Sequence, residues 1–338
     1  PPTQKTALLP SPSPEAMTMQ KQPDAEPTRL AASVEVTPRQ IEKDPAVLEL
    51  IPPATRTYLV DLGTMQDGEW AAVTKSLTRA GLEPVPHIAA RRLKSAAALE
   101  SRLSAMVSEA GIRDVLLIAG GAGAPEGPFG STMDVLETGL LDRYGIRRMA
   151  VAGHPEGSPD ISDAAIEAAI KWKSEFAERT DADMRITTQF SFDAHAAIRW
   201  AEALKRGGVT LPIHIGVAGP ASIRSLLKYS AMCGVRASSA FAFKRGAQIA
   251  SLLTSYSPEP FVGPIEQHVA DTADANVQQL HVFPFGGIAE TRRWLVERGT
   301  WDASARAGLD ALHPKQATEG PVSSTDVLSS ANGGGGAA

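Results

Sequence analysis

The sequence predicts an α/β protein built as a (β/α)8 TIM barrel. Short runs of β-branched and aliphatic residues alternate with amphipathic helical patterns, which is typical of parallel βα units. Eight such units fit a closed barrel better than an open doubly wound sheet, which stays the structural alternative. The eight predicted strands span residues 33–36, 57–62, 83–88, 114–119, 147–152, 185–190, 212–217 and 280–283.

Composition narrows the class of protein and its partners. The chain has 338 residues, 43% of them apolar, which is enough for a large core. Its 33 basic and 38 acidic residues give a net charge of −5, and no basic stripe is present, which argues against nucleic acid as a partner. Apolar runs are too short to span a bilayer, so the sequence predicts a cytoplasmic protein with no membrane partner, and leaves open a homo-oligomer.

The ends of the chain differ from its middle. Residues 1–29 are rich in proline and are predicted to form a disordered leader. Residues 306–338 become rich in serine, threonine and glycine and are predicted to form a flexible tail. The catalytic barrel is therefore expected over residues 30–305. The single cysteine, Cys233, excludes an intrachain disulfide and is predicted to be a small buried residue.

Several predicted helices carry both start and stop signals. Helical patterns run from Asp67 to Gly81, from Ser95 to Gly111, and from a Ser-x-x-Asp capping box at Ser131 to Gly145. Each of them follows one of the predicted strands, as βα units require. In such a barrel, chemistry is expected at the C-terminal ends of the strands.

The first strand carries a carboxylate. Alternation places Val34 and Val36 on one face and Glu35 on the other, which is the barrel interior if helices cover the first face. A carboxylate there is costly unless it is functional or paired. The residues alone leave open whether Glu35 is catalytic or is held by a neighbouring lysine or arginine.

The third and fourth strands end in a histidine and in glycines. His87 could hold the polar edge of a ligand or be a satisfied core residue, and no metal-ligand spacing accompanies it, so no metal site is predicted. Gly120 and Gly121 would let backbone amides approach a phosphate or a flat ring. The glycine spacing matches neither a dinucleotide fingerprint nor a P-loop, and a loop without a ligand is the alternative.

The next two units supply a lysine and a glutamine. Lys173 falls on the same helical stripe as Ile166 and Ile170, so it either meets an anion or extends its amine to solvent. Period two places Gln189 on one face with Thr187 and Ser191. Its amide suits the edge of a planar heterocycle, and a structural role between strands is the alternative.

Taken together, these segments resemble the methylenetetrahydrofolate reductase family. The most specific pieces are Thr-Gln-Phe-x-Phe-Asp at 188–193 and Pro-Glu-x-x-Pro at 155–159, supported by Ser-x-Glu at 33–35, Pro-His at 86–87 and Pro-Ile-x-x-Gly at 212–216. The resemblance implies a barrel in which NADH or NADPH reduces FAD, which then reduces 5,10-methylenetetrahydrofolate to 5-methyltetrahydrofolate. The reverse reaction would use the same residues.

The resemblance also implies roles for individual residues. Glu35 matches the acid catalyst and Gln189 the glutamine that contacts the folate and the nicotinamide, while Ile223 takes the place of a residue that packs against substrate. The residues that match flavin-binding positions are His87, Gly120, Gly121, His154, Ser158 and Lys173.

The chain departs from the family pattern at several flavin-binding positions. The usual Arg-Gly-Asp after the fourth strand reads Ala119-Gly120-Gly121, His154 replaces an aromatic residue, Ser158 replaces a histidine, and Asp61 replaces a threonine. These changes predict weaker flavin binding than the family norm. The alternatives are a non-catalytic folate- or flavin-binding barrel and a flavin-free barrel lyase or transferase.

Overall fold

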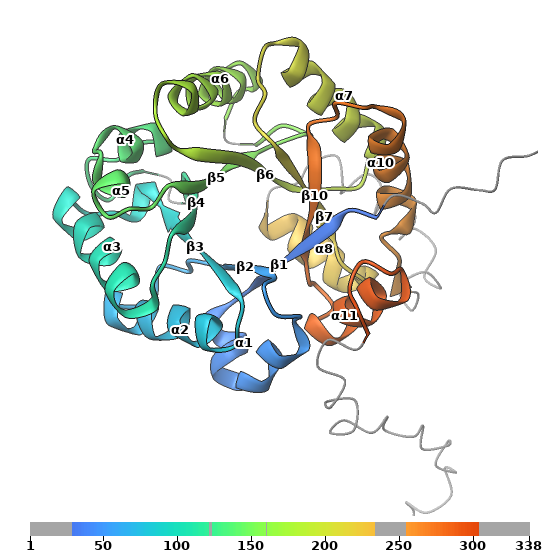
Figure 1. The fold of residues 1–338 in the computed structure, drawn as a ribbon, viewed down its shortest axis with the longest axis horizontal. Coiled ribbons are helices and arrows are strands. Elements are labelled where there is room, and N and C mark those ends of the chain that lie inside the picture. The colour runs from blue at the N-terminus through green and yellow to red at the C-terminus, as the bar shows by residue number, and fades with distance from the viewer. Residues whose placement is uncertain (1–28, 122–123, 160, 234–254, 304–338) are drawn as a thin grey trace, which may run out of the picture.

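A computed structural model describes residues 29–121, 124–159, 161–233 and 255–303. Eight parallel strands form a closed barrel in the order β1-β10-β7-β6-β5-β4-β3-β2, and helices surround it (Figure 1). Pairing of β1 with both β10 and β2 closes the sheet, so the barrel prediction is confirmed and the open-sheet alternative is wrong. The predicted tail, and the predicted leader apart from Arg29, lie outside the described residues.

Every predicted strand is present, with bounds that shift by a few residues. The barrel strands are β1 (Ala31–Val36), β2 (Arg56–Leu59), β3 (Glu83–Ala89), β4 (Asp114–Ile118), β5 (Arg148–Gly153), β6 (Asp183–Ser191), β7 (Ile213–Ala218) and β10 (Val277–Phe283). A separate antiparallel pair consists of β8 (Ala221–Ser222) and β9 (Ser255–Tyr256).

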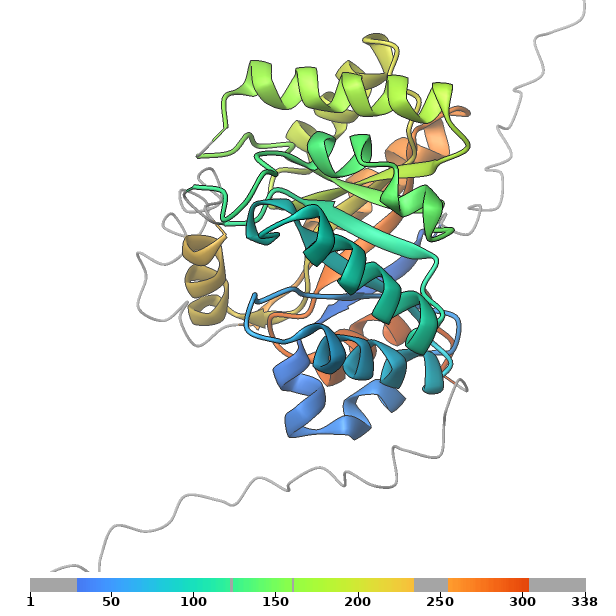
Figure 2. The same ribbon diagram turned by 90° about the vertical axis from the view of Figure 1, so that its left-hand side faces the viewer.

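Helices connect the strands, and most of them lie on the outside of the barrel. They are α1 (Pro38–Lys43), α2 (Asp67–Arg79), α3 (Ala96–Ala110), α4 (Thr132–Glu137), α5 (Leu140–Arg143), α6 (Asp163–Arg179), α7 (Ala194–Arg206), α8 (Ile223–Met232), α10 (Glu259–Asp271) and α11 (Ile288–Glu297), with the short 3-10 helices η1 (Pro45–Leu50) and η2 (Ala90–Arg92). In Figure 2, α8 (gold) stands apart from the outer ring of helices at one end of the barrel. In the described part of the chain, no helix is long and apolar enough to cross a membrane.

The predicted capping chemistry explains where several helices begin and end. The Ser95 hydroxyl accepts a hydrogen bond from the Ala98 amide at the start of α3, and Gly111 ends that helix in a left-handed conformation. The Ser131 capping box is also present. The single helix predicted after it is wrong, because Gly139 adopts a positive φ of 67° and separates α4 from α5.

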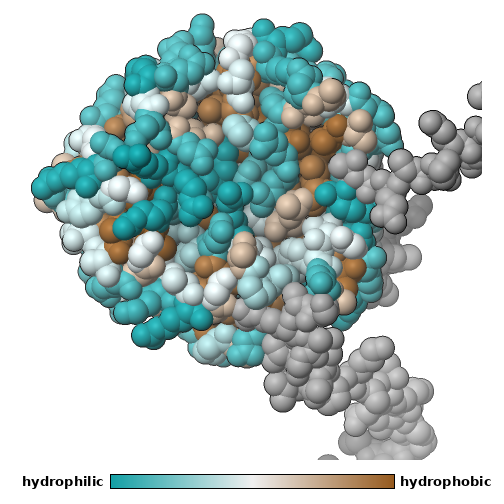
Figure 3. All heavy atoms as spheres, viewed as in Figure 1, coloured by the Kyte–Doolittle hydropathy of each residue, from teal (hydrophilic) through white to brown (hydrophobic). Residues whose placement is uncertain are grey.

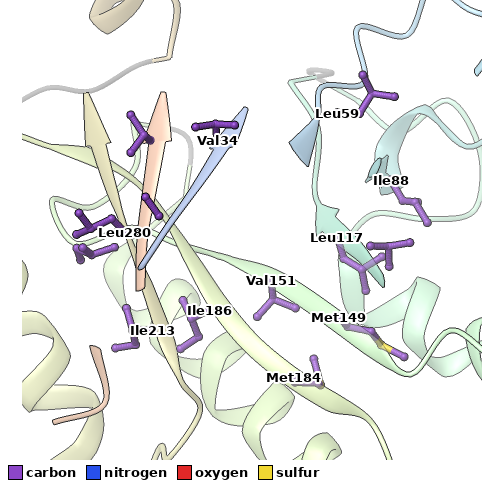
Figure 4. Close-up of a cluster of buried hydrophobic side chains, with 14 of the residues drawn as sticks. Val34, Leu59, Ile88, Leu117, Met149, Val151, Met184, Ile186, Ile213 and Leu280 are labelled. Atoms are coloured by element: carbon purple, nitrogen blue, oxygen red, sulfur yellow. The ribbon is translucent and has the colours of Figure 1, made fainter. Parts of the chain in front are cut away.

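The main core lies between the barrel and its helices. It is built from the outward-facing side chains of all eight barrel strands, ten of which are labelled in Figure 4. Val34, Leu117, Ile213 and Leu280 are completely buried there. Burying an aliphatic side chain of this size contributes roughly 1.5–3 kcal/mol, so this layer accounts for much of the stability of the fold.

The barrel interior is polar at the N-terminal ends of the strands. The buried Asp114 carboxylate at the start of β4 receives a hydrogen bond from Arg185 at 2.9 Å and lies 3.9 Å from Arg56 and 3.8 Å from Arg148. Arg185 also donates to the hydroxyl of Tyr58 at 3.1 Å. Hydrophilic residues gather over the centre of the face seen in Figure 3.

A buried ion-pair cluster links the first barrel strand to the last two helices. Arg298, just after α11, forms two hydrogen bonds to the Glu266 carboxylate of α10, at 3.1 and 2.8 Å. Glu266 also accepts hydrogen bonds from the Arg29 side chain and from the Leu30 amide, both at 3.0 Å. The cluster therefore fixes the entry to β1, where the barrel closes against β10.

Candidate functional site

The candidate site begins with Glu35 at the C-terminal end of β1. Its Oε2 oxygen lies 3.5 Å from Nε2 of His281 on β10 and 3.7 Å from Nε2 of His87 on β3. The carboxylate is partly exposed, at 18%, whereas both imidazoles are almost completely buried. Within the described ranges, no lysine or arginine forms an ion pair with Glu35, and the ionisable side chains within 4 Å of its carboxylate there are the two histidines.

The sequence interpretation missed His281. On β10, Gln279, His281 and Phe283 share the interior face, and His281 pairs in register with Ser33, which lies two residues before Glu35. Polar residues alternate with apolar ones after residue 278, and this pattern indicates that Gln279 and His281 face the barrel interior. They could not be assigned to Glu35 because the two strands are far apart in sequence and meet only when the barrel closes.

Gln189 lies at a bulge in β6. Thr187 pairs with His214 of β7 but Phe190 pairs with Gly216, so three residues of β6 oppose two of β7. The predicted single face for Thr187, Gln189 and Ser191 is therefore wrong, because the extra residue shifts the alternation and aligns Phe190 with the interior position. The Gln189 side-chain oxygen accepts a hydrogen bond from the Phe190 amide at 3.0 Å.

The bulge depends on a glycine in the neighbouring strand. A Cβ atom on Gly216 would lie 2.5 Å from the carbonyl oxygens of both Thr188 and Gln189. The Gly216 amide instead donates to the Thr188 hydroxyl at 2.7 Å. A glycine at residue 216 therefore lets the backbone that carries Gln189 approach β7 closely.

We expect Gly216→Ala to displace the bulge and lower the free energy of unfolding by about 1–3 kcal/mol, because the added methyl group meets backbone atoms that cannot rotate away. Urea unfolding measures this. Gly263→Ala is the control, because nothing lies within 4 Å of the added atom in α10, and it should be neutral or stabilising. Equal effects of the two substitutions would contradict the close approach.

The two most specific sequence motifs contact each other. The Glu156 carboxylate, in the loop after β5, accepts hydrogen bonds from the Ser191 hydroxyl and, at 3.2 Å, from the Phe192 amide at the end of β6. Asp193 then caps α7 by accepting from the Ala196 amide at 2.9 Å. These contacts fix the loops on either side of Gln189. The Pro-Glu motif and the Phe-Asp motif therefore contact each other directly in this fold.

Lys173 is a buried cation near the same end of the barrel. It is 6% exposed, as the helical stripe predicted, and among the described residues it forms no hydrogen bond or ion pair. Burial lowers its pKa to about 8. Burial also lowers the pKa of His154, which directly follows β5, and the charge of Lys173 lowers it further. Helical side chains lean toward the helix N-terminus, here toward the loops that follow the strands.

We expect Lys173→Met to be more stable than the wild type at pH 7 by on the order of 3 kcal/mol, because the folded protein holds this charge against a desolvation penalty. The folded pKa of about 8 lies below the unfolded value of about 10.4. Between about pH 8 and about pH 10.4 the unfolded chain keeps a proton on Lys173 that the folded chain has lost, so the stability of the wild type rises with pH. The difference in free energy of unfolding between Lys173→Met and the wild type therefore shrinks over this interval.

Urea unfolding at several pH values measures both effects of Lys173→Met. The control is Lys171→Met, an exposed position two residues earlier on α6, which should change the free energy of unfolding little. Wild-type stability that stays flat between pH 8 and pH 10 would show that the buried amine is not destabilising.

The loop after β4 packs against the loop after β3. Gly120 has a φ of +86°, and a Cβ atom on it would lie 3.1 Å from the Ala89 side chain. Gly121 is exposed, and a Cβ atom on it would meet nothing within 4 Å. Ser158 is half-buried in the loop after β5. Asp61, after β2, is held by Arg102 at 2.7 Å.

Aromatic side chains line another side of the same end. Phe190 contacts the rings of Phe192, Phe283 and Phe285, and Tyr229 of α8 stacks on Phe285 at 4.5 Å. Ile223 is 6% exposed and packs in the same cluster as Phe190. We call this group the aromatic wall; its members are Phe190, Phe192, Tyr229, Tyr256, Phe283 and Phe285. The sequence interpretation missed it, because the rings come from separate elements.

Two further predictions concern metal and cysteine. Across the described ranges, no group of three histidine, cysteine or acidic side chains is arranged to hold a metal ion. Cys233 is exposed at the C-terminal end of α8, so the predicted buried position is wrong.

Comparison with known proteins gives low-identity structural likenesses and one family match. An uncharacterized protein from Clostridium thermocellum that binds two copies of 5-methyl-5,6,7,8-tetrahydrofolic acid is 9% identical, with a TM-score of 0.47 over 84% of this chain and 97% of that one. Dihydropteroate synthase from Thermus thermophilus is 13% identical, with a TM-score of 0.40 over 82% and 94%. Homocysteine methyltransferase from Escherichia coli is 10% identical, with a TM-score of 0.44 over 80% and 96%.

These identities are too low to transfer a function. The sequence model described as methylenetetrahydrofolate reductase, in contrast, matches residues 57–245, a segment that contains His87, Gly120, Lys173, Gln189 and their loops. Since this segment is more than half of the chain, the protein belongs to the methylenetetrahydrofolate reductase family.

Proposed function

We propose that this protein is a methylenetetrahydrofolate reductase-type oxidoreductase of one-carbon metabolism. It would interconvert 5,10-methylenetetrahydrofolate and 5-methyltetrahydrofolate with hydride from NADH or NADPH, through FAD, in a step that supplies methyl groups for methionine biosynthesis. The observation that carries the proposal is Glu35, a partly exposed carboxyl group at a strand end whose near ionisable neighbours, among the described residues, are two buried imidazoles.

Glu35 has the properties that an acid catalyst needs. The five-membered ring of methylenetetrahydrofolate opens when the departing nitrogen receives a proton, which leaves a reactive iminium carbon. A carboxyl group positioned beside that nitrogen contributes typically 10²- to 10⁴-fold to such a step. A lysine or arginine partner would hold Glu35 as a carboxylate and oppose this role, and the described residues contain no such partner.

Gln189 and the aromatic wall are suited to binding the folate. The Gln189 amide keeps its NH₂ donors for a ligand, because only its oxygen is used in the described structure, where it accepts from the Phe190 amide. The aromatic wall offers ring faces and edges next to Ile223, a surface that suits flat rings. Together they would orient the pterin and exclude water from the iminium carbon.

Gln189→Ala should raise the Michaelis constant for the folate about 5- to 150-fold, because the ligand's amide edge loses a partner worth about 1–3 kcal/mol. Flavin content should stay constant. Steady-state kinetics and the absorbance spectrum measure the two quantities. A variant that loses flavin but keeps the wild-type Michaelis constant for the folate would show that Gln189 contacts the flavin and not the folate.

The residues present fit a flavin. Lys173 is a buried amine with no described counterion, a type of group that suits a diphosphate, and His154 lies within its electrostatic range. Gly120 brings the backbone close to β3 where His87 lies, and Gly121 and Ser158 would contribute from the adjoining loops. When bound, FAD would accept a hydride from the nicotinamide and pass it to the folate. Ala119 and Gly121 stand where the family pattern has an arginine and an aspartate, so FAD would bind more weakly than in the family norm.

A reconstitution experiment tests the proposal. The full chain is mixed with FAD, and anaerobic flavin reduction by NADH and by NADPH is followed by absorbance. Reduction by at least one nicotinamide, with near-equimolar bound flavin, is the expected result. Failure to bind flavin at any concentration would instead favour a flavin-free barrel.

A further inference from the structure

Two unpartnered nitrogen atoms converge on one oxygen of Glu35. The Nε2 atoms of His281 and His87 are both buried, and neither has a hydrogen-bond partner among the described residues. They lie 3.5 and 3.7 Å from the same atom, Glu35 Oε2. Buried polar atoms are nearly always satisfied, because an unsatisfied one costs about 1–3 kcal/mol. If the Glu35 carboxyl group and one of the imidazoles moved slightly closer, Glu35 Oε2 and that Nε2 atom would form a hydrogen bond.

The serine beneath Glu35 indicates which nitrogen of His281 carries the proton. The Ser33 hydroxyl donates to the Leu280 carbonyl at 3.2 Å, and its oxygen lies 3.1 Å from Nδ1 of His281. A hydroxyl has one proton, so the bond to His281 requires an N–H on Nδ1. In the neutral ring, Nε2 then carries a lone pair that faces Glu35 Oε2. Two acceptors at this distance need a proton between them.

In the part of the chain that the structure describes, no cationic side chain is paired with Glu35 or His281. Burial lowers the pKa of His87, so it is neutral at pH 7. Tyr58 of β2, whose pKa burial raises, packs its ring 4.3 Å from His281, and its hydroxyl is held by Thr187 and Arg185. Among the described residues, Cys233 at the end of α8 interacts electrostatically with Glu35, Asp61, which is paired with Arg102, interacts with His87, and the neutral His214 of β7 interacts with His281.

We infer that His281 is a positioning residue for Glu35, and that the imidazole and the carboxyl group share one proton. This inference rests on the proposed acid role of Glu35 and identifies His281 as the group that keeps a proton available to the Glu35 carboxyl group. When Glu35 gives the proton to the departing nitrogen of the substrate, an O–H bond breaks and an N–H bond forms. A carboxylate and a neutral imidazole remain, and one proton from solvent restores the pair.

Nuclear magnetic resonance of the full chain tests the shared proton without substrate. Histidine is labelled with ¹⁵N and glutamate with ¹³C at the carboxyl carbon, and the His281 and Glu35 signals are assigned by their loss in His281→Gln and Glu35→Gln. We expect Nδ1 of His281 to carry the proton and both signals to change over one pH interval. In Glu35→Gln, the His281 transition should move by about one pH unit or more.

Two further variants make the test specific. Ser33→Ala removes the oxygen that holds Nδ1 and should change the tautomer of His281 while the protein stays folded. His214→Gln removes another buried interior imidazole that has no ion-pair contact with Glu35, and it should leave the Glu35 signal nearly unchanged. A His281 ring protonated on Nε2, or a His281 transition unaffected by Glu35→Gln, would overturn the inference.

Activity provides an independent second readout. In His281→Gln, reoxidation of the reduced flavin by methylenetetrahydrofolate should slow about tenfold and change its pH profile, while reduction by nicotinamide stays constant. If the protein shows a coupled Glu35–His281 titration but no reductase activity, the inference of a shared proton is supported and the proposed function is refuted. If the protein shows reductase activity but no coupled titration, the proposed function is supported and the inference of a shared proton is refuted.

Discussion

In Glu35→Gln, reoxidation of reduced flavin by methylenetetrahydrofolate should be slowed by about two orders of magnitude or more, while flavin reduction by nicotinamide stays largely intact. Glutamine keeps the shape of the side chain but has no acidic proton to give to the departing nitrogen. The nicotinamide step transfers a hydride and needs no such proton. Stopped-flow absorbance of the flavin measures the two half-reactions separately.

Glu42→Gln is the matched control for this experiment. It makes the same chemical change on an exposed position of α1, where no contact with the candidate site is present in the described structure. Both half-reactions should keep their wild-type rates. Equal slowing of both half-reactions in Glu35→Gln would indicate a structural glutamate, and no slowing of either would remove Glu35 from the mechanism.

Glu266→Ala should lower the free energy of unfolding by about 3–5 kcal/mol, the largest stability effect that we expect. The substitution removes the partner of two hydrogen bonds of the Arg298 guanidinium, 3% exposed, and leaves it only the more exposed Glu259 at 2.8 Å as a counter-charge. It also leaves the Leu30 amide at the entry to β1 without its acceptor. Breaking a buried pair by removing one member is strongly destabilising, because the remaining charge stays in a poorly solvated place. Chemical unfolding measures the effect.

Glu290→Ala is the comparison for Glu266→Ala. Glu290 forms an ion pair with Arg293 at 2.7 Å, but both side chains are about half exposed on α11. Exposed pairs of this kind contribute roughly 0–1 kcal/mol. If Glu266→Ala cost no more than Glu290→Ala, the cluster that joins α10, α11 and β1 would not stabilise the closure of the barrel.

Local patterns were sufficient to predict the architecture. Strand positions follow from short aliphatic runs, and helix ends follow from caps such as Ser95 and Gly111, because each signal lies within a few residues of its effect. The same reasoning placed Glu35 in the barrel interior and Lys173 on a buried stripe. The break at Gly139 was missed, because a glycine inside an apolar helical pattern carries no local sign of its positive φ.

Contacts that depend on barrel closure could not be predicted. His281 meets Glu35 only because β10 pairs with β1 across more than 240 residues of chain. The β6 bulge at Gln189 depends on Gly216 in the next strand, and the aromatic wall combines rings from four or more elements. Each of these features needs the register between strands, which composition and periodicity do not contain.

The most direct test of the proposed function is a single anaerobic turnover with the full chain. The protein is loaded with FAD, reduced, and mixed with 5,10-methylenetetrahydrofolate while flavin absorbance and the folate products are followed. We predict that the flavin is reoxidised and that 5-methyltetrahydrofolate forms in equal amount. Reduced flavin that persists in the presence of excess methylenetetrahydrofolate, with no 5-methyltetrahydrofolate formed, would contradict it.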